Sequence, residues 1–351
     1  MSAAGDRCQS RVRFLISFRS RGQKRASRAA AAINTNVASN YPNDEMPNCI
    51  IDKRQFPGSS RITNERKTID ITTLDLMRAS LTVGYPLTLS TFWDNLAIYM
   101  YKFLRLPGLF WLFTTDNGDL RIRDFVYQLT QSDKNVLSYD LGMILTKVAA
   151  EKELYIPWLR HADELITNKV ALLGKTKKRG DLIGKDKFND WHVIEAKGRL
   201  TNPSRKVIDN AKKQSQNIKS VNGTSPKTTS ASINYLFKTP VEIVIIDPPN
   251  ENAEREINFE ESNFFVEYYL KLITLLQSFE RETTVYGQNR YSTLSITINK
   301  RTFQIGLLEE IFNEPAKAFD IVRNREFNTG TNKDEQVSFG TDGIMIRVSV
   351  G

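Results

Sequence analysis

The stretch that decides the fold reads Arg179-Gly180-Asp181-Leu182-Ile183-Gly184, then a polar turn, then Trp191-His192-Val193-Ile194-Glu195-Ala196-Lys197-Gly198-Arg199. Apolar residues bracket the charged ones in both halves, which predicts two neighbouring β-strands, at 180–183 and 191–197. Side chains alternate between the faces of a strand, so Glu195 and Lys197 point the same way. Antiparallel pairing of the two strands would bring Asp181 beside Glu195. We therefore expect two carboxylates and one ammonium group to converge at a sheet edge.

The flanking sequence predicts further elements on both sides of these strands. Apolar residues at helical spacing predict a helix over 138–154, and Pro203-Ser204 starts a second helix that runs to about 221. A short strand is expected near 169–173, a polar loop over 222–240, and a buried strand over the apolar run 241–247. The expected order is therefore helix, three strands, helix, strand.

This stretch resembles the core of the PD-(D/E)XK nuclease superfamily, the restriction-endonuclease-like fold. Asp181 followed by Glu195-Ala196-Lys197 matches the acid and the acid-x-Lys triplet of that family, while Gly180 stands where the family most often has Pro. The ending Glu-Ala-Lys-Gly-Arg is similar to that of uncharacterised bacterial members. The resemblance covers roughly 138–247 and implies an α/β fold with an α-β-β-β-α-β mixed-sheet core.

The resemblance also implies roles for individual residues. Asp181, Glu195 and the backbone carbonyl of Ala196 would bind Mg²⁺ or Mn²⁺, because hard cations prefer oxygen ligands. Lys197 would orient the attacking water or stabilise developing charge on the phosphate. Gln214, the polar residue on the inward stripe of the second helix, would point into the active site.

Charge is unevenly distributed along the chain, whose formal net charge is +9. Residues 169–227 hold 15 Lys/Arg against 5 Asp/Glu, and this basic region coincides with the candidate active site. Such a coincidence favours a polyanionic substrate, with DNA expected. The residues expected to contact nucleic acid lie at the end of the second strand and along the second helix: Arg199, Arg205, Lys206, Lys212, Lys213 and Lys219.

Plainer interpretations remain open for each feature. Glu195 and Lys197 could form an incidental surface ion pair, and the basic helix face could be merely solvated. Asp140, Glu151 and Glu153 on the first helix are candidates for a further active-site acid, with capping or solvent-facing roles as the alternative. Neither histidine has an identifiable catalytic partner.

Outside the core, three regions are expected. Residues 1–43 form a basic segment predicted to be disordered, with an organellar transit peptide as the alternative to a cytoplasmic protein. Residues 44–130 form a helix-rich N-terminal region with a helix over 91–105. Residues 131–351 form the nuclease domain, whose C-terminal extension contains a helix at about 263–281, strands at 292–299 and 302–307, and a hairpin over 337–350.

Together these features predict a metal-dependent nuclease that hydrolyses phosphodiester bonds, in a setting of bacterial defence, restriction or repair. The alternatives are a non-catalytic nucleic-acid-binding module and a structural subunit that retains the fold. Two cysteines allow no disulfide framework, and no apolar run is long enough to span a membrane. Partners would be nucleic acid, a second copy of the chain or a protein of a defence system, without a membrane.

Overall fold

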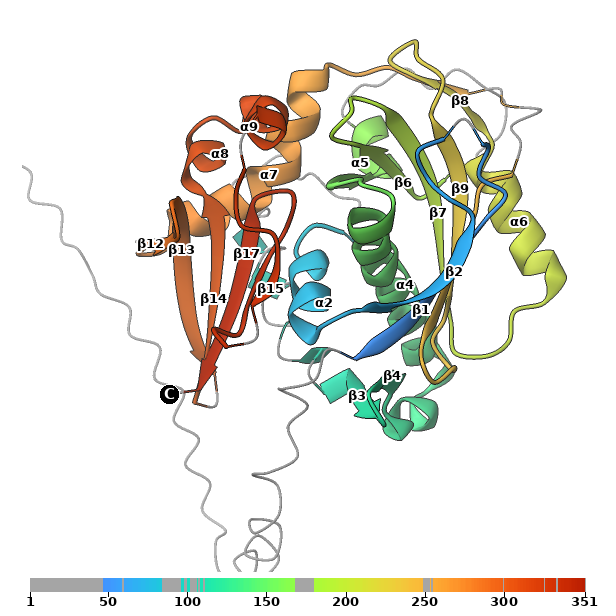
Figure 1. Cartoon of the computed structure of the whole chain (residues 1–351), viewed down its shortest axis with the longest axis horizontal. Helices are drawn as coiled ribbons and strands as arrows, with labels where there is room; N and C mark the ends of the chain where they lie inside the picture. The colour runs from blue at the N-terminus through green and yellow to red at the C-terminus, as the bar shows by residue number, and fades with distance from the viewer. Residues whose placement is uncertain are drawn as a thin grey trace, which may run out of the picture. The chain divides into compact units, whose positions relative to one another are not determined.

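The computed structural model describes residues 47–58, 60–83, 96–97, 100–101, 106, 108–109, 111–167, 180–248, 253, 255–298, 300–324, 326–332 and 334–350. All of them belong to the segment Asp44–Gly351, which folds as an α/β structure with two major sheets (Figure 1). The expected disordered segment 1–43 and the strand expected near 169–173 lie outside the described residues.

The larger sheet is mixed and contains nine strands within the described part of the chain. Its order is β3-β4-β1-β10-β9-β7-β6-β5, and β2 also pairs with β1. Strands β5, β6 and β7 run antiparallel to one another, whereas β9 is parallel to β7. The bounds are β1 (Asn48–Arg54), β2 (Glu65–Asp70), β3 (Phe113–Asp116), β4 (Asp119–Ile122), β5 (Trp158–His161), β6 (Leu182–Lys185), β7 (Trp191–Arg199), β9 (Thr228–Tyr235) and β10 (Glu242–Ile246).

Two helices, α4 (Gln131–Glu153) and α6 (Arg205–Ser215), cover opposite faces of this sheet (Figure 1). Asn234 of β9 donates to the Gly142 carbonyl of α4 over 3.2 Å. Ala211 of α6 instead packs against Ala231 and Ile233 of β9. Because successive strand residues alternate between faces, these contacts place the two helices on opposite sides.

The expected element order is partly corrected by these assignments. The strand at 191–197 is confirmed as β7, and the strand expected at 180–183 begins at Leu182 as β6. The expected loop 222–240 instead contains β9, whose alternation of small polar and apolar residues carries a weaker signal than an apolar run. The buried strand expected over 241–247 is confirmed as β10, which lies beyond β9.

The second helix is also shorter than expected. It ends at Ser215, and β8 (Ile218–Val221) follows and pairs in parallel with β11 (Arg255–Ile257). The buried apolar positions Ile218 and Val221 are three residues apart, which is helical spacing and explains the error.

Helix α4 contacts β7 backbone to backbone, and two glycines permit this. A Cβ atom on Gly198 would lie 1.8 Å from the Ser138 carbonyl oxygen, and one on Gly142 would lie 2.4 Å from the Gly198 nitrogen. Neither position can hold a larger residue without moving the helix away. The glycine pair therefore fixes the distance between α4 and the strand that carries Glu195 and Lys197.

Residues 44–130 contribute strands to the large sheet, a feature that the expectation of a helix-rich region did not include. Residues 68–82 contain the end of β2 and then α2 (Thr73–Ser80), which starts at a capping box of Thr72 and Asp75. The 3₁₀-helix η1 (Asp124–Gln128) follows β4. Most of the helix expected over 91–105 lies outside the described residues.

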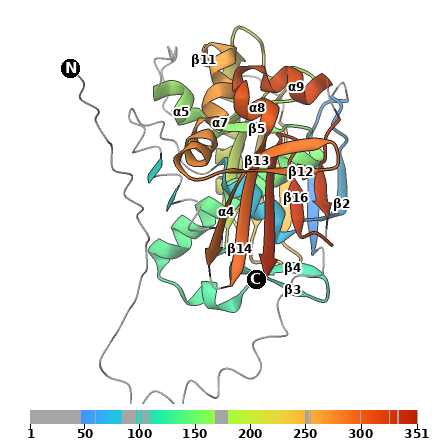
Figure 2. The same cartoon turned by 90° about the vertical axis from the view of Figure 1, so that its left-hand side faces the viewer.

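The C-terminal extension is an antiparallel sheet in the order β12-β13-β14-β17-β16-β15, which faces the viewer in Figure 2. The expected helix, two strands and hairpin are confirmed as α7, β13, β14 and the β16–β17 pair. The bounds are α7 (Glu261–Ser278), β12 (Glu282–Tyr286), β13 (Asn289–Ile298), β14 (Arg301–Leu308), β15 (Gly330–Asn332), β16 (Val337–Phe339) and β17 (Ile344–Val350); the short helices are α5 (Ala162–Thr167), α8 (Glu309–Asn313), η2 (Pro315–Lys317) and α9 (Ala318–Asn324).

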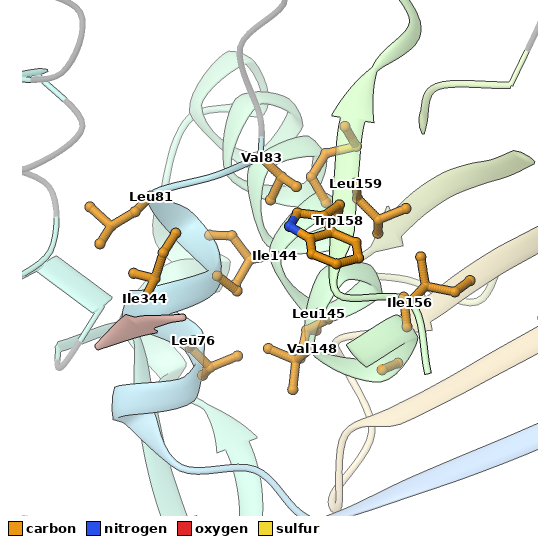
Figure 3. Close-up of a cluster of buried hydrophobic side chains, with 14 of the residues drawn as sticks. Leu76, Leu81, Val83, Ile144, Leu145, Val148, Ile156, Trp158, Leu159 and Ile344 are labelled. Atoms are coloured by element: carbon orange, nitrogen blue, oxygen red, sulfur yellow. The ribbon is translucent and has the colours of Figure 1, made fainter. Parts of the chain in front are cut away.

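One continuous apolar core joins this second sheet to the first. Figure 3 shows Ile344 of β17 near Leu76 of α2 and near Leu81, the residue that follows α2, with Ile144 of α4 to their right. Trp158 of β5 lies in the same cluster and is fully buried. The two sheets are therefore packed into one body around α2 and α4.

A buried ionic network supports the same junction. Arg78 donates to Glu151 over 2.8 Å, and Asp342, in the turn before β17, lies 3.3 Å from the Lys147 ammonium group. The Glu151 carboxylate thus binds a buried arginine and the backbone amide of Thr341, not an active-site metal. Removing one partner of such a pair would leave an uncompensated buried charge, so the network links α2, α4 and the last hairpin.

Candidate active site

The candidate site forms where β6 begins and the edge of β7 becomes free. The β6–β7 ladder starts with Leu182 opposite Ile194, so Asp181 stands just outside it. The Asp181 carboxylate takes the place of the missing strand and accepts a 3.1 Å hydrogen bond from the Ala196 amide. On the other edge, β7 stays paired with β9 as far as Arg199. The strands thus separate at the carboxylate pair.

Gly180, directly before Asp181, has a packing role. It is buried, and a Cβ atom there would lie 2.6 Å from Val193 Cγ1. A larger residue would push the chain off β7 and carry Asp181 with it. The departure from the resembled pattern at this position therefore suits the local packing.

Asp181, Glu195 and Lys197 meet as expected from strand alternation and antiparallel pairing. The Lys197 ammonium group forms an ion pair with Glu195 Oε1 and lies 3.6 Å from Asp181 Oδ2. Glu195 is fully buried, whereas a quarter of the Lys197 side chain (24%) is exposed. The cluster therefore has one side open to solvent, through Lys197 and Asp181.

The environment of Glu195 disfavours its charged form. Burial, followed by repulsion from Asp181, raises the pKa of Glu195 to about 8, against an opposing attraction from Lys197. Apart from the Lys197 ammonium group, neither buried Glu195 oxygen has a hydrogen-bond donor. A buried carboxylate without a satisfied donor is the kind of group that a cation would stabilise.

The donor set fits a hard divalent cation. Mg²⁺ is commonly held by one or two carboxylates together with water and a substrate phosphate, and Asp181 and Glu195 provide the carboxylates. The N–H and C=O of one strand residue point to the same edge. The Ala196 amide points to the strand edge where Asp181 lies, so the Ala196 carbonyl points to that edge as well. This is the edge on which the third expected metal ligand, the Ala196 carbonyl oxygen, would be needed. Among the described residues, no group of three or more His, Cys, Asp or Glu side chains that could hold a metal ion occurs, so this site offers two carboxylates.

The face of the sheet that carries Glu195 is the one that α6 covers. Glu195 is level with Ala231 and Lys197 with Ile233, and both β9 residues pack against Ala211 of α6. Arg199 continues the same row and is half-buried, which lowers its pKa. Arg199 thus extends the basic end of the row beyond Lys197.

Gln214 is not brought into this cluster. Its side chain is half-buried beside Ser215, and no hydrogen bond joins it to Asp181, Glu195 or Lys197, all of which are described. Ser215 instead anchors the helix end through a 2.8 Å hydrogen bond to the Thr229 carbonyl. Gln214 therefore lies next to the anchor of α6 and remains only a candidate for substrate contact.

Four of the expected phosphate-binding residues do lie together on α6. Arg205, Lys206 and Lys213 are exposed, Lys212 is half-exposed, and none has an ion pair among the residues that the structure places. Lys219 was expected on the same helix face, which is wrong: it lies on β8 and pairs with Glu256 over 3.5 Å. The helix therefore carries four cations that are free to meet an anion.

The sequence could not reveal other features of the site. The Gly142–Gly198 contact that seats β7 requires knowledge of which helix crosses which strand. His161, at the end of β5, has its Nε2 3.0 Å from the Tyr139 hydroxyl and accepts from the Asp163 amide. The Gly142–Gly198 contact and the Tyr139–His161 pair each join residues that are more than twenty positions apart in the sequence. No sequence signal could have identified them.

Glu153 and the second histidine also have structural partners. Glu153 pairs with Lys53 and Lys67 on the β1–β2 side of α4. His192 hydrogen-bonds Thr228 over 2.9 Å and lies on the opposite strand face from Glu195, as its position predicts. The described chemistry of the site therefore rests on Asp181, Glu195, Ala196 and Lys197.

Comparison with known proteins gave no further guide: no protein-family model, no curated protein and no solved structure matches the chain. In the described part of the chain, no helix is both long and apolar enough to cross a membrane.

Proposed function

We propose that the protein is a metal-dependent nuclease that hydrolyses phosphodiester bonds, with DNA as the substrate. The observation that carries the proposal is the convergence of Asp181, Glu195 and Lys197 at the point where β6 and β7 separate. Two carboxylates beside one ammonium group, on the side of the sheet that carries four unpaired helix cations, suit a phosphate substrate.

The arrangement of the core supports the same proposal. A helix, three antiparallel strands, a second helix and a strand parallel to the third follow in the order α4-β5-β6-β7-α6-β9. Apart from α5 after β5 and β8 after α6, this order is compatible with the α-β-β-β-α-β order of the restriction-endonuclease-like fold. Asp181 lies directly before β6 and Glu195 lies on β7. A bacterial defence, restriction or repair role would follow from membership of that superfamily.

Different residues of the site would bind the metal, stabilise the transition state and bind the nucleic-acid backbone. Asp181, Glu195 and the Ala196 carbonyl would hold the divalent metal, which when bound supplies charge stabilisation and activates water. Lys197 sits against both carboxylates and would turn to the phosphate or the attacking water, where one positive charge stabilises the transition state. Arg205, Lys206, Lys212 and Lys213 would bind the nucleic-acid backbone and fix its register.

The proposal is tested by incubating purified protein with supercoiled plasmid in Mg²⁺, Mn²⁺ or EDTA. We expect cleavage only with a divalent ion, and its loss in Glu195→Gln. Glu280→Gln, an exposed change two residues after α7 ends, is the matched control and should cleave normally. Cleavage by cleanly purified Glu195→Gln at the wild-type rate would end the assignment to this site.

A second candidate is favoured by the ion pair itself. Lys197 contacts Glu195 and approaches Asp181, which is also the arrangement expected of a purely structural cluster in a non-catalytic nucleic-acid-binding module. In that case either Glu195→Gln or Lys197→Ala would lower stability, and salt-sensitive DNA binding would occur without cleavage.

A further inference from the structure

A cavity lies on the C-terminal sheet, away from the sheet that carries the carboxylate cluster. It is a cavity of about 570 Å³, within the range of small-molecule sites, and most of its surface is polar. It opens between the end of β12, the 328–332 segment and the hairpin of β16 and β17. The side chains that matter below are those of Tyr286, Asn328, Glu335, Phe339 and Arg347.

Strand register places this cavity on the outer face of the sheet. Ile344, Ile346 and Val348 of β17 are buried in the shared core, so the alternate residue Arg347 points to the other face. Gln304 of β14 lies directly opposite Arg347 and points to the same side. The same face also carries the buried apolar residues Met345, Val337 and Phe339, so Arg347 and Gln304 lie at the border of the core.

Two polar side chains in the cavity lie against each other without an anionic partner. The Arg347 guanidinium group interacts with the Tyr286 hydroxyl, whereas the buried Arg347 Nε has no acceptor, and Arg347 has no ion pair among the residues that the structure places. Burial raises the pKa of Tyr286, which Arg347 partly opposes, so the phenol keeps its proton. A buried donor without an acceptor costs free energy, which an oxyanion placed between the two would recover.

The rest of the lining suits a planar ring. Tyr286 and Phe339 meet edge to face with their ring centroids 5.1 Å apart, which leaves aromatic surface on the cavity wall. Exposed Glu335 near the rim can accept hydrogen bonds from an amino group or a hydroxyl. Its solvent exposure limits its repulsion of an anion held deeper, beside Arg347.

We propose that this cavity binds a nucleotide, with the phosphate between Arg347 and Tyr286 and the base against the aromatic rings. The combination of one unpaired guanidinium, an aromatic wall and a rim acceptor matches the three parts of a nucleotide: phosphate, base and amino or hydroxyl groups. The ligand is either a free mononucleotide or one nucleotide of a single strand, since both carry the same chemistry. The site is independent of the proposed nuclease activity.

The test is isothermal titration calorimetry on the full-length protein in EDTA, where metal-dependent cleavage does not occur. The probes are inorganic phosphate, adenosine, adenosine 5′-monophosphate and a short single-stranded oligonucleotide. Arg347→Ala, Arg347→Lys and Tyr286→Phe remove or alter the donors. Arg290→Ala is the matched control, because Arg290 is an exposed cation of β13 in the same sheet and pairs with Glu309 over 2.7 Å.

We expect the monophosphate to bind more tightly than phosphate or adenosine alone. Arg347→Ala should weaken its binding at least tenfold, Arg347→Lys less, and Tyr286→Phe about threefold. Arg290→Ala should bind as the wild type does. Preference for the oligonucleotide over the monophosphate, with the same dependence on Arg347, would assign the site to a strand.

Two results would overturn the proposal. One is the lack of saturable wild-type binding to either nucleotide probe, and the other is equal weakening by Arg347→Ala and Arg290→Ala. Should Arg347→Ala fail to fold, Arg347→Lys and Tyr286→Phe retain the test, since each preserves most of the side-chain volume. If the wild-type protein binds the nucleotide but does not cleave plasmid with any divalent ion, the nuclease proposal alone is rejected.

Discussion

Replacement of Glu195 by glutamine should make the metal-free protein more stable at alkaline pH. Burial and then Asp181 raise the pKa of Glu195 from its ordinary 4.5 to about 8. Between these values the unfolded chain has lost the proton and the folded protein keeps it. The free energy of unfolding therefore falls as the pH rises from 4.5 and levels off above pH 8.

The size of the effect follows from the same linkage. Each pKa unit is worth about 1.4 kcal/mol, so the full difference of about 3.5 units is on the order of 5 kcal/mol. Glutamine keeps the shape of the side chain and cannot lose a proton in this range, although it forfeits the attraction to Lys197. We expect Glu195→Gln to exceed the wild type by about 2–4 kcal/mol at pH 8, with little difference at pH 4.5.

Urea unfolding in EDTA at several pH values, followed by fluorescence of buried Trp158 and Trp191, measures this difference. Glu280→Gln should retain the wild-type pH dependence, because Glu280 is exposed. Added Mg²⁺ should stabilise the wild type more than Glu195→Gln, since a ligand that binds only the folded state stabilises it. The same pH slope in the wild type and in Glu195→Gln would refute the reasoning.

Four further outcomes are expected. Lys197→Ala should lower plasmid cleavage by ~10²–10³ and leave DNA binding intact, the effect of losing one electrostatic stabiliser; equal loss of binding would contradict it. Lys212→Glu with Lys213→Glu should weaken DNA binding and flatten its salt dependence by about one unit of slope per lost contact, unlike Lys219→Glu, in a filter-binding assay. Gly198→Ala should destabilise the protein by roughly 3 kcal/mol in urea unfolding, because its Cβ would meet the Ser138 carbonyl at 1.8 Å, whereas Gly58→Ala should not. Burial raises the pKa of Asp247 to about 7, so Asp247→Asn should remove a fall in stability between about pH 4 and 7 in the same assay; an unchanged pH profile would argue against it.

The geometry of the carboxylate cluster could be predicted because it depends on local rules. Strand alternation places Glu195 and Lys197 on one face, and a short turn forces antiparallel pairing with the strand that follows Asp181. Both rules act over about twenty residues. The structure accordingly joins these three side chains as expected.

Elements whose identity depends on distant contacts were harder to predict. The segment 228–235 is polar enough to resemble a loop, and it becomes a central strand because α4 supplies partners for Ser232 and Asn234. A polar side chain in a buried strand is stable only when such partners exist. Likewise β1 joins the sheet through Ile243 and its neighbours on β10, almost two hundred residues away.

The pairing register determines whether the cluster exists at all. A slip of β7 by one residue against β9 would turn Glu195 and Lys197 towards α4, where Gly142 and Ser138 leave no room for a side chain. Gly198 is the residue of β7 that fits beneath α4, and it lies between Lys197 and Arg199 on the other face. The glycine that permits helix contact on one face therefore fixes the basic and acidic row on the other. For this reason Gly198→Ala is expected to disturb the site and the fold together.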